Sequence, residues 1–223
     1  MIIVFDLDDT LYKEITYVKS GFKVVADEIA RKYDLDSEVI YRDALLLLDR
    51  SGRGHIFDAL LKNYGYYTKR EVQRLVTIYR LHYPNIQIGG EEMKVLKQCG
   101  TDSNLYLVTD GNKLVQSKKI ESLGLGPLFK RIFITHRFGL DAAKPSLKCF
   151  EIIRKLENVT WSELVYIGDD PNKDFINLKK AGAVTVRVMT GRFSDVKKGQ
   201  EFEADWQIES LGDLPAILRK IHS

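Results

Sequence analysis

Two aspartates near the start of the chain are the residues best placed to do chemistry. Asp6 and Asp8 directly follow the apolar run Ile2–Phe5, which predicts a short buried strand. Side chains two positions apart in an extended chain point the same way, so both carboxylates would lie at the carboxyl end of that strand, where open α/β sheets bind ligands. Like charges this close favour either a bound Mg²⁺ or a nucleophile beside a proton donor. From this stretch alone, an acidic turn that caps the following helix is an equally good interpretation.

Two further segments place groups that suit an anion. Thr109, Asp110 and Gly111 follow a predicted strand at 105–108, and a hydroxyl with backbone N–H groups at a helix start can hold an anion. Taken alone, a helix cap with a turn glycine is the simpler interpretation. Lys144 precedes a proline at a predicted helix start, where an ordinary solvated lysine is again the simpler interpretation.

A third segment carries three aspartates, Asp169, Asp170 and Asp174, after a predicted strand at 164–167. Acidic residues at a strand end can bind a hard cation, whereas a plain turn does not require so much charge. Parallel strands put their carboxyl ends on one edge of a sheet, so all these segments can converge. Carboxylates, a hydroxyl, an anion cradle and one lysine form an inventory that suits phosphoryl transfer.

The order of the predicted elements indicates how these residues are positioned. From residue 91 onward helical and strand patterns alternate, which favours a parallel sheet with helices on both faces. The stretch 15–83 shows helical spacing, as at Val18, Phe22 and Val25, with a predicted break at 49–55 where two glycines interrupt the helical pattern. We therefore predict an α/β fold, with a Rossmann-like parallel-sheet core at 1–14 and 85–223 and an inserted all-helical domain at 15–84. The predicted core strands are 2–5, 105–108, 131–134, 164–167, 184–188 and 206–208, and the predicted core helices are 91–99, 114–123, 147–156, 175–181 and 211–221.

Composition narrows the class of protein. The 223 residues are 44% hydrophobic and 29% charged, which is ordinary for a globular protein with a buried core. The net charge of +3 gives no electrostatic footprint for nucleic acid. Cys99 and Cys149 lack metal-ligand spacing and are predicted to be reduced, buried thiols. With no signal-peptide pattern and no apolar run of membrane-spanning length, we expect a cytoplasmic protein that binds no membrane.

These motifs, in this order, resemble those of the haloacid dehalogenase-like hydrolase superfamily, in its phosphatase branch. The first motif of that family matches Asp6 to Thr10, the second Thr109, the third Lys144 with its proline, and the fourth Gly168 to Asp174. The helical insertion resembles the family's class 1 cap domain. The resemblance implies a Rossmann-like core, dependence on Mg²⁺ and an aspartyl-phosphate intermediate.

The resemblance also implies roles for single residues. Asp6 is expected to be the nucleophile and Asp8 the acid and then base. Lys144 would offset negative charge, and Asp174 would orient that lysine or support the metal shell. Asp6 and Asp169, with the backbone carbonyl of Asp8, would hold Mg²⁺. The remaining expected site residues are Asp170, as a further metal ligand through water, and Thr109, Thr10, Asp110 and Gly111, as phosphate-binding groups.

Two features bear on specificity. Many members of the family it resembles carry acidic residues before the lysine motif, whereas this chain has His136 and Arg137. This difference is expected to alter the rim of the site and need not change the chemistry. The segment 50–55 carries two glycines around Arg53. It is either a solvated turn between helices or, as the resemblance suggests, a cap loop in which Arg53 contacts a second anionic group of the substrate.

The function predicted from these features is a Mg²⁺-dependent phosphatase acting on a small soluble phosphomonoester, such as a sugar phosphate or a nucleotide. A phosphomutase of the same fold and a catalytically silent binding module are the alternatives. The expected partner is the small-molecule phosphate ester, with no nucleic acid, and the expected state is a monomer or a homodimer.

Overall fold

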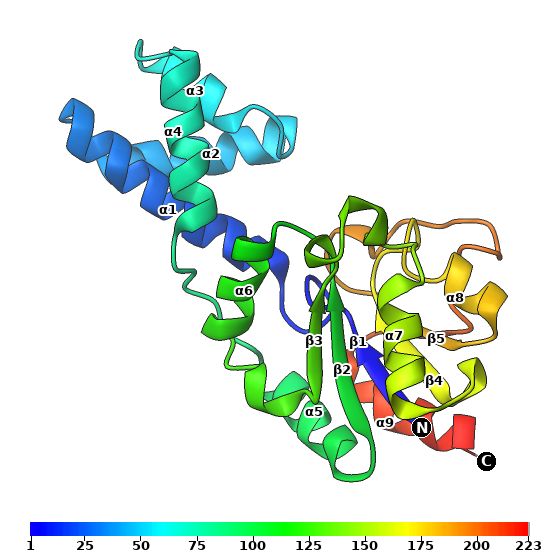
Figure 1. Cartoon of the computed structure of the whole chain (residues 1–223). Helices are drawn as coiled ribbons and strands as arrows, with labels where there is room; N and C mark the ends of the chain where they lie inside the picture. The colour runs from blue at the N-terminus through cyan, green and yellow to red at the C-terminus, as the bar shows by residue number, and fades with distance from the viewer. Residues whose placement is uncertain (223) are drawn as a thin grey trace. The chain divides into compact units, whose positions relative to one another are not determined.

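The protein is built around a six-stranded sheet in which every pair of neighbouring strands is parallel (Figure 1). It is known from a computed structural model that describes residues 1–222. The strand order is β3-β2-β1-β4-β5-β6. The strands are β1 (Ile2–Phe5), β2 (Asn104–Thr109), β3 (Arg131–Ile134), β4 (Leu164–Gly168), β5 (Val184–Val188) and β6 (Trp206–Ile208). The predicted α/β class with a parallel, Rossmann-like sheet is therefore confirmed.

The chain divides into two compact units. The core unit contains Met1–Glu14 and the chain from Gln87 onward, and the helical unit is Ile15–Ile86. The helices of the core unit are α5 (Gly90–Asp102), α6 (Lys113–Ser122), α7 (Lys148–Glu157), α8 (Ile176–Ala181) and α9 (Leu214–His222). In the described residues, no helix is both long and apolar enough to cross a membrane.

The central strands are buried on both faces, as their continuous apolar sequences require. One buried core cluster contains residues of three strands and two helices: Ile2 and Val4 of β1, Tyr106 and Val108 of β2, Leu164 and Tyr166 of β4, Phe150 of α7 and Leu178 of α8. Their odd-numbered neighbours, such as Ile3, are also buried and belong to the opposite face of the sheet. Packing on both faces of the sheet fixes the ends of the central strands. The polar residues that directly follow these strands are therefore held in place as well.

The helical unit contains α1 (Glu14–Tyr33), which begins in the core unit, then α2 (Ser37–Ser51), α3 (Ile56–Asn63) and α4 (Lys69–Leu81). Asp36 caps α2 by accepting from the backbone N–H groups of Glu38 and Val39, and Thr68 caps α4 in the same way. The core of the unit includes an aromatic cluster around Tyr79. The unit Ile15–Ile86 is thus built from the helices α1 to α4.

Several predicted element boundaries need correction. The break after α2 begins at Gly52, which has a φ of 67°, so residues 49–51 are helical rather than part of the loop. The Lys144 motif does not start a helix, because α7 begins only at Lys148. The last helix begins at Leu214, after a short 3₁₀ turn over Leu211–Asp213 that a Ser210 capping box closes.

Candidate active site

The sheet brings three of the predicted segments to one edge. Phe5, the last residue of β1, pairs with Leu107 of β2 on one side and with Ile167 of β4 on the other. The backbone N–H of Asp6 donates to the carbonyl of Ile167 at 2.8 Å. The strand order reverses direction at β1, and this switch point is where open α/β sheets bind ligands. Asp6 and the loop after β4 therefore flank that crevice.

Lys144 lies at the centre of this edge, with its side chain 1% exposed. Its Nζ is 2.9 Å from Asp6 Oδ1 and 2.8 Å from Asp174 Oδ1. It also donates to Tyr166 Oη at 2.8 Å, and that hydroxyl donates to Asp174 Oδ1 at 3.0 Å. Burial favours the neutral amine, but the charges of Asp174 and Asp6 outweigh it and hold the pKa of Lys144 well above its ordinary value. The lysine is a fixed positive charge beside Asp6.

Three carboxylates gather around this lysine. One carboxylate oxygen from each of Asp6, Asp169 and Asp174 lies within 4.8 Å of the other two. Burial, with the charge of Asp174, raises the pKa of Asp6 to about 7 in spite of Lys144. Burial, then the charges of Asp6 and Asp174, raise the pKa of Asp169 to about 9. Raised values of this kind indicate buried negative charge that the protein's own cations do not neutralise.

The cluster fits a hard divalent cation, because it consists of carboxylate oxygens at close range. Asp174 is the member whose oxygens are already engaged. Its Oδ1 contacts Lys144 and Tyr166, and its Oδ2 accepts from the backbone N–H of Asp170 at 2.9 Å. Asp6 and Asp169 are thus the better candidates for direct ligands, with Asp174 as support.

Asp110 positions the lysine segment from the end of β2. Its Oδ1 accepts from Thr135 Oγ1 at 2.8 Å and from the backbone N–H of Lys144 at 3.1 Å, and its Oδ2 is 3.4 Å from Lys173 Nζ. Burial alone would raise the pKa of Asp110, but the charges of Lys144 and Lys173 lower it below its ordinary value. Gly111 has a φ of 131°, and a Cβ there would lie 3.3 Å from the Gln116 side chain, so this turn favours glycine.

Asp8 has a different environment from Asp6. Its Oδ1 accepts from Tyr12 Oη at 2.6 Å and from Lys119 Nζ at 2.7 Å, and its Oδ2 accepts from Gln116 Nε2 at 2.9 Å. Burial would raise the pKa of Asp8, but the charge of Lys119 and these hydrogen bonds lower it. The two carboxylates of the first motif are therefore held by separate lysines.

The remaining predicted residues are placed as follows. Thr10 is buried, and its Oγ1 has no hydrogen-bond partner among the described residues. Asp170 Oδ1 accepts from the backbone and side chain of Asn172 at 3.0 and 2.7 Å, and Asp170 is not part of the carboxylate cluster found in residues 1–222. Arg53 belongs to the helical unit, where it lines a pocket described below. Arg137 donates to Ser117 Oγ at 2.6 Å.

Sequence reasoning missed the residues that hold the site together. Tyr166 reads as an ordinary core aromatic of β4, and Arg187, 1% exposed, donates to the carbonyl of Asp169 at 3.2 Å. Gln116 and Lys119 left a signal in the sequence. They occupy the positions of α6 in line with Ile120, where a core-facing helix normally places apolar side chains.

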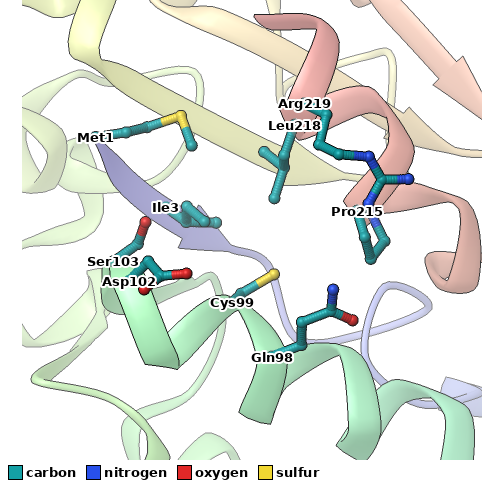
Figure 2. A pocket seen from close by; sticks show the side chains of 9 residues that line it. All are labelled: Met1, Ile3, Gln98, Cys99, Asp102, Ser103, Pro215, Leu218 and Arg219. Atoms are coloured by element: carbon teal, nitrogen blue, oxygen red, sulfur yellow. The ribbon is translucent and has the colours of Figure 1, made fainter. Parts of the chain in front are cut away.

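A cavity of about 270 Å³ opens at the other edge of the sheet, by the amino end of β1 (Figure 2). Figure 2 shows Met1 and Ile3 facing Cys99 of α5 and Leu218 of α9 across it. Its lining contains none of the predicted site residues. Because Asp6 follows the carboxyl end of β1, this cavity is separate from the carboxylate cluster.

The sheet has the order of an α/β fold, and at its carboxyl edge lie three carboxylates that could hold a metal ion. The model of the haloacid dehalogenase-like hydrolase family matches residues 1–182. This chain belongs to that family, which confirms the predicted family and the prediction that the chain is an enzyme, a hydrolase.

Two phosphatases are similar in sequence to this chain over almost its whole length. The chain is 28% identical to the glyceraldehyde 3-phosphate phosphatase of Methanocaldococcus jannaschii, covering 98% of this chain and 97% of that protein. It is 27% identical to the enzyme of the same description from Methanopyrus kandleri, with the same coverage. Among solved structures, the putative HAD-hydrolase YfnB of Bacillus subtilis, bound to magnesium, is similar with a TM-score of 0.67, 20% identity and 97% coverage of both chains. That likeness supports the fold.

Proposed function

We propose that this chain is a Mg²⁺-dependent phosphatase that hydrolyses a small phosphomonoester through a phosphorylated aspartate. The observation that carries the proposal is the contact of Lys144 Nζ with Asp6 Oδ1 at 2.9 Å, inside a cluster of three buried carboxylates. A nucleophilic carboxylate next to a fixed cation suits attack on a phosphoryl group, whose charge must be neutralised as it transfers.

The chain's residues divide the reaction between them. Asp6 attacks phosphorus, and its bond to phosphorus forms as the bond to the leaving oxygen breaks. Asp8 gives that oxygen a proton, and afterwards takes one from the water that hydrolyses the phosphorylated Asp6. Lys144 offsets the charge that Asp6 and the phosphoryl group bring together. Thr109 and the backbone N–H groups of the following turn hold phosphate oxygens, as N–H groups at a helix start do elsewhere.

Mg²⁺ would be held by Asp6 and Asp169, with the backbone carbonyl of Asp8, and by Asp170 through water. When bound, it neutralises the phosphoryl oxygens and the carboxylates. Asp174 supports the site by holding Lys144 and, through Oδ2, the backbone of Asp170. The raised pKa values of Asp6 and Asp169 support this assignment, because a cation favours the charged forms that burial disfavours.

The substrate class we assign is a short sugar phosphate. Full-length similarity to two glyceraldehyde 3-phosphate phosphatases supports it and makes glyceraldehyde 3-phosphate the first compound to test. Free, buried Cys99 and Cys149 suit a cytoplasmic enzyme of metabolism.

The helical unit is proposed to act as the cap that selects the substrate. Within this unit, a pocket of about 280 Å³ is lined by apolar side chains that include Phe22 and Phe57 and by the polar residues Arg53, His55, Asp58 and Arg80. A guanidinium beside apolar surface can hold a second anionic group of a small metabolite. This supports the proposed role of Arg53 over a solvated turn.

The test is phosphate release from a panel of phosphomonoesters, with Mg²⁺ and after chelation. The panel contains glyceraldehyde 3-phosphate, other sugar phosphates, nucleotides and p-nitrophenyl phosphate, and Asp6→Asn is the control protein. A phosphatase releases phosphate from at least one member only when the metal is present. Isomerised sugar phosphate that appears only with a bisphosphate activator would instead identify a phosphomutase. If no member of the panel is hydrolysed, the result would favour the alternative of a catalytically silent binding module.

A further inference from the structure

Helix α6 buries a glutamine and a lysine on its inner face. Gln116 and Lys119 are each 2% exposed, and Ile120 is the third buried residue of the helix. Amides and ammonium groups leave water at a large cost unless they find partners, and lysine is rarely fully buried without one. Apolar packing therefore does not explain why these two side chains are inside the protein.

Both side chains end on the carboxylate of Asp8. Lys119 Nζ donates to Oδ1 at 2.7 Å and Gln116 Nε2 donates to Oδ2 at 2.9 Å. Tyr12 Oη donates to Oδ1 at 2.6 Å, and Gln116 Nε2 also donates to Thr109 Oγ1 at 2.6 Å. Three donors on two oxygens fix the rotation of the carboxylate, and Gln116 fixes its place relative to the Thr109 hydroxyl.

We propose that Gln116 and Lys119 are positioning residues that hold Asp8 in line for proton transfer to the leaving oxygen and from the attacking water. The inference rests on the proposed phosphatase function and adds to it a link between α6 and the acid–base group. Proton transfer depends on alignment, and a carboxylate that turns away from the reacting oxygen loses rate in both steps. Neither residue needs to touch the substrate for this role.

A purely structural role, in which the two residues anchor α6 to the loop after β1, predicts different kinetics. An alkyl phosphate needs a proton on its leaving oxygen as the P–O bond breaks. p-Nitrophenolate is a stable anion and leaves without one. A misaligned Asp8 therefore leaves phosphorylation of Asp6 by p-nitrophenyl phosphate fast, and slows only the later hydrolysis, in which Asp8 accepts a proton from water.

The experiment compares Lys119→Met, Gln116→Met and Lys119→Arg with the wild-type chain on the best alkyl phosphate of the panel and on p-nitrophenyl phosphate. Lys155→Met, at an exposed position of α7, is the matched control for loss of one lysine. Circular dichroism and thermal unfolding verify the fold of each protein. If Lys119→Met does not fold, Gln116→Met carries the same test without a change of charge.

We expect kcat on the alkyl phosphate to fall roughly ten- to hundredfold in the two methionine variants, with KM within about twofold. On p-nitrophenyl phosphate they should release a burst of one equivalent of nitrophenolate per enzyme before a slow steady rate. Lys119→Arg should recover most of the alkyl-phosphate rate, and Lys155→Met should match the wild type. An unchanged kcat, a loss confined to KM, or an equal loss on both substrates without a burst would overturn the inference while the phosphatase function stands. A wild-type chain inactive on every ester would overturn both.

Discussion

Replacing Asp169 with asparagine is expected to stabilise the metal-free protein. Asp169 is 4% exposed, and burial with the charges of Asp6 and Asp174 raises its pKa to about 9 from an ordinary 3.8. An acid whose pKa is raised by folding loses stability as pH climbs from its unfolded value toward its folded value. At pH 7 the unfolded chain ionises this group and the metal-free folded chain keeps it protonated, so the carboxyl opposes folding.

The size of the expected stabilisation follows from the shift in the pKa of Asp169. Each pKa unit corresponds to about 1.4 kcal/mol, and the roughly three units between 3.8 and pH 7 give about 4 kcal/mol. Asp6 and Asp174 share the repulsion, so we expect removal of this ionisable group to recover about 2 to 4 kcal/mol. In a chain of this length, that raises the unfolding temperature by about 5 to 15 °C. Asparagine keeps the size of the side chain and cannot ionise.

Unfolding of the core unit can be followed by tryptophan fluorescence, because both tryptophans, Trp161 and Trp206, lie in that unit. Thermal unfolding at pH 7 is compared with and without Mg²⁺, using EDTA for the metal-free samples. The wild type should gain about 3 kcal/mol from Mg²⁺ at a hundredfold excess over its Kd, and Asp169→Asn should gain almost nothing. The exposed residue Asp102 supplies a control, Asp102→Asn, which should behave as the wild type. A metal-free Asp169→Asn protein that melts below the wild type would refute the electrostatic reasoning.

Four further outcomes are expected. Asp6→Asn should abolish turnover with an unchanged circular dichroism spectrum, whereas Asp8→Asn should lower kcat on the order of a hundredfold; near-normal rates of Asp6→Asn would contradict the mechanism. Chelation should abolish activity and Ca²⁺ should inhibit, since its larger coordination number draws both oxygens of the nucleophile into binding; Ca²⁺ that matches Mg²⁺ in steady-state rate would count against the metal assignment. Arg53→Ala should raise KM by roughly one to two orders of magnitude for panel members with a second anionic group and leave p-nitrophenyl phosphate unchanged, while equal damage to both would indicate a structural role. Glu71→Gln should destabilise the helical unit by about 1 to 2 kcal/mol at pH 7, because the hydrogen bonds from Arg74 lower the pKa of Glu71 to about 2; the deficit should vanish as pH falls from 4.5 through 2, and a pH-independent deficit would show that charge is not its cause.

The sequence was sufficient to predict the strands that carry the site. Each is a short apolar run followed by polar residues, and parallel pairing alone brings those residues to one edge. The first residues after β1 and β4, Asp6 and Asp169, were predicted in this way, and the structure places their carboxylates within one cluster. The motif residue Lys144 was also predicted, although it does not start a helix, because α7 begins only at Lys148. Helix starts depend on local capping, which a proline alone does not fix.

The side chains that orient these groups were not predicted, because their partners lie far away in sequence. Lys119 meets Asp8 across 111 positions, and Tyr166 joins Lys144 across 22. No periodic pattern encodes such a pair. A helix with polar residues at buried positions is the one local hint, and it marks where the chain departs from simple apolar packing.

Charge balance explains why the two aspartates of the first motif differ. Around Lys144, the carboxylates of Asp6, Asp169 and Asp174 outnumber the one ammonium group in contact with them. If all three were ionised, two negative charges would remain, and a divalent cation would neutralise them. Asp8 is instead paired with Lys119 at 2.7 Å, so its carboxylate is neutralised without a metal. A side chain already satisfied in this way has little tendency to join the metal shell, and residue 8 would therefore contribute its backbone carbonyl there. Its carboxylate would then stay out of the metal shell, and Lys119 favours its charged form, which is the form that takes a proton from the attacking water.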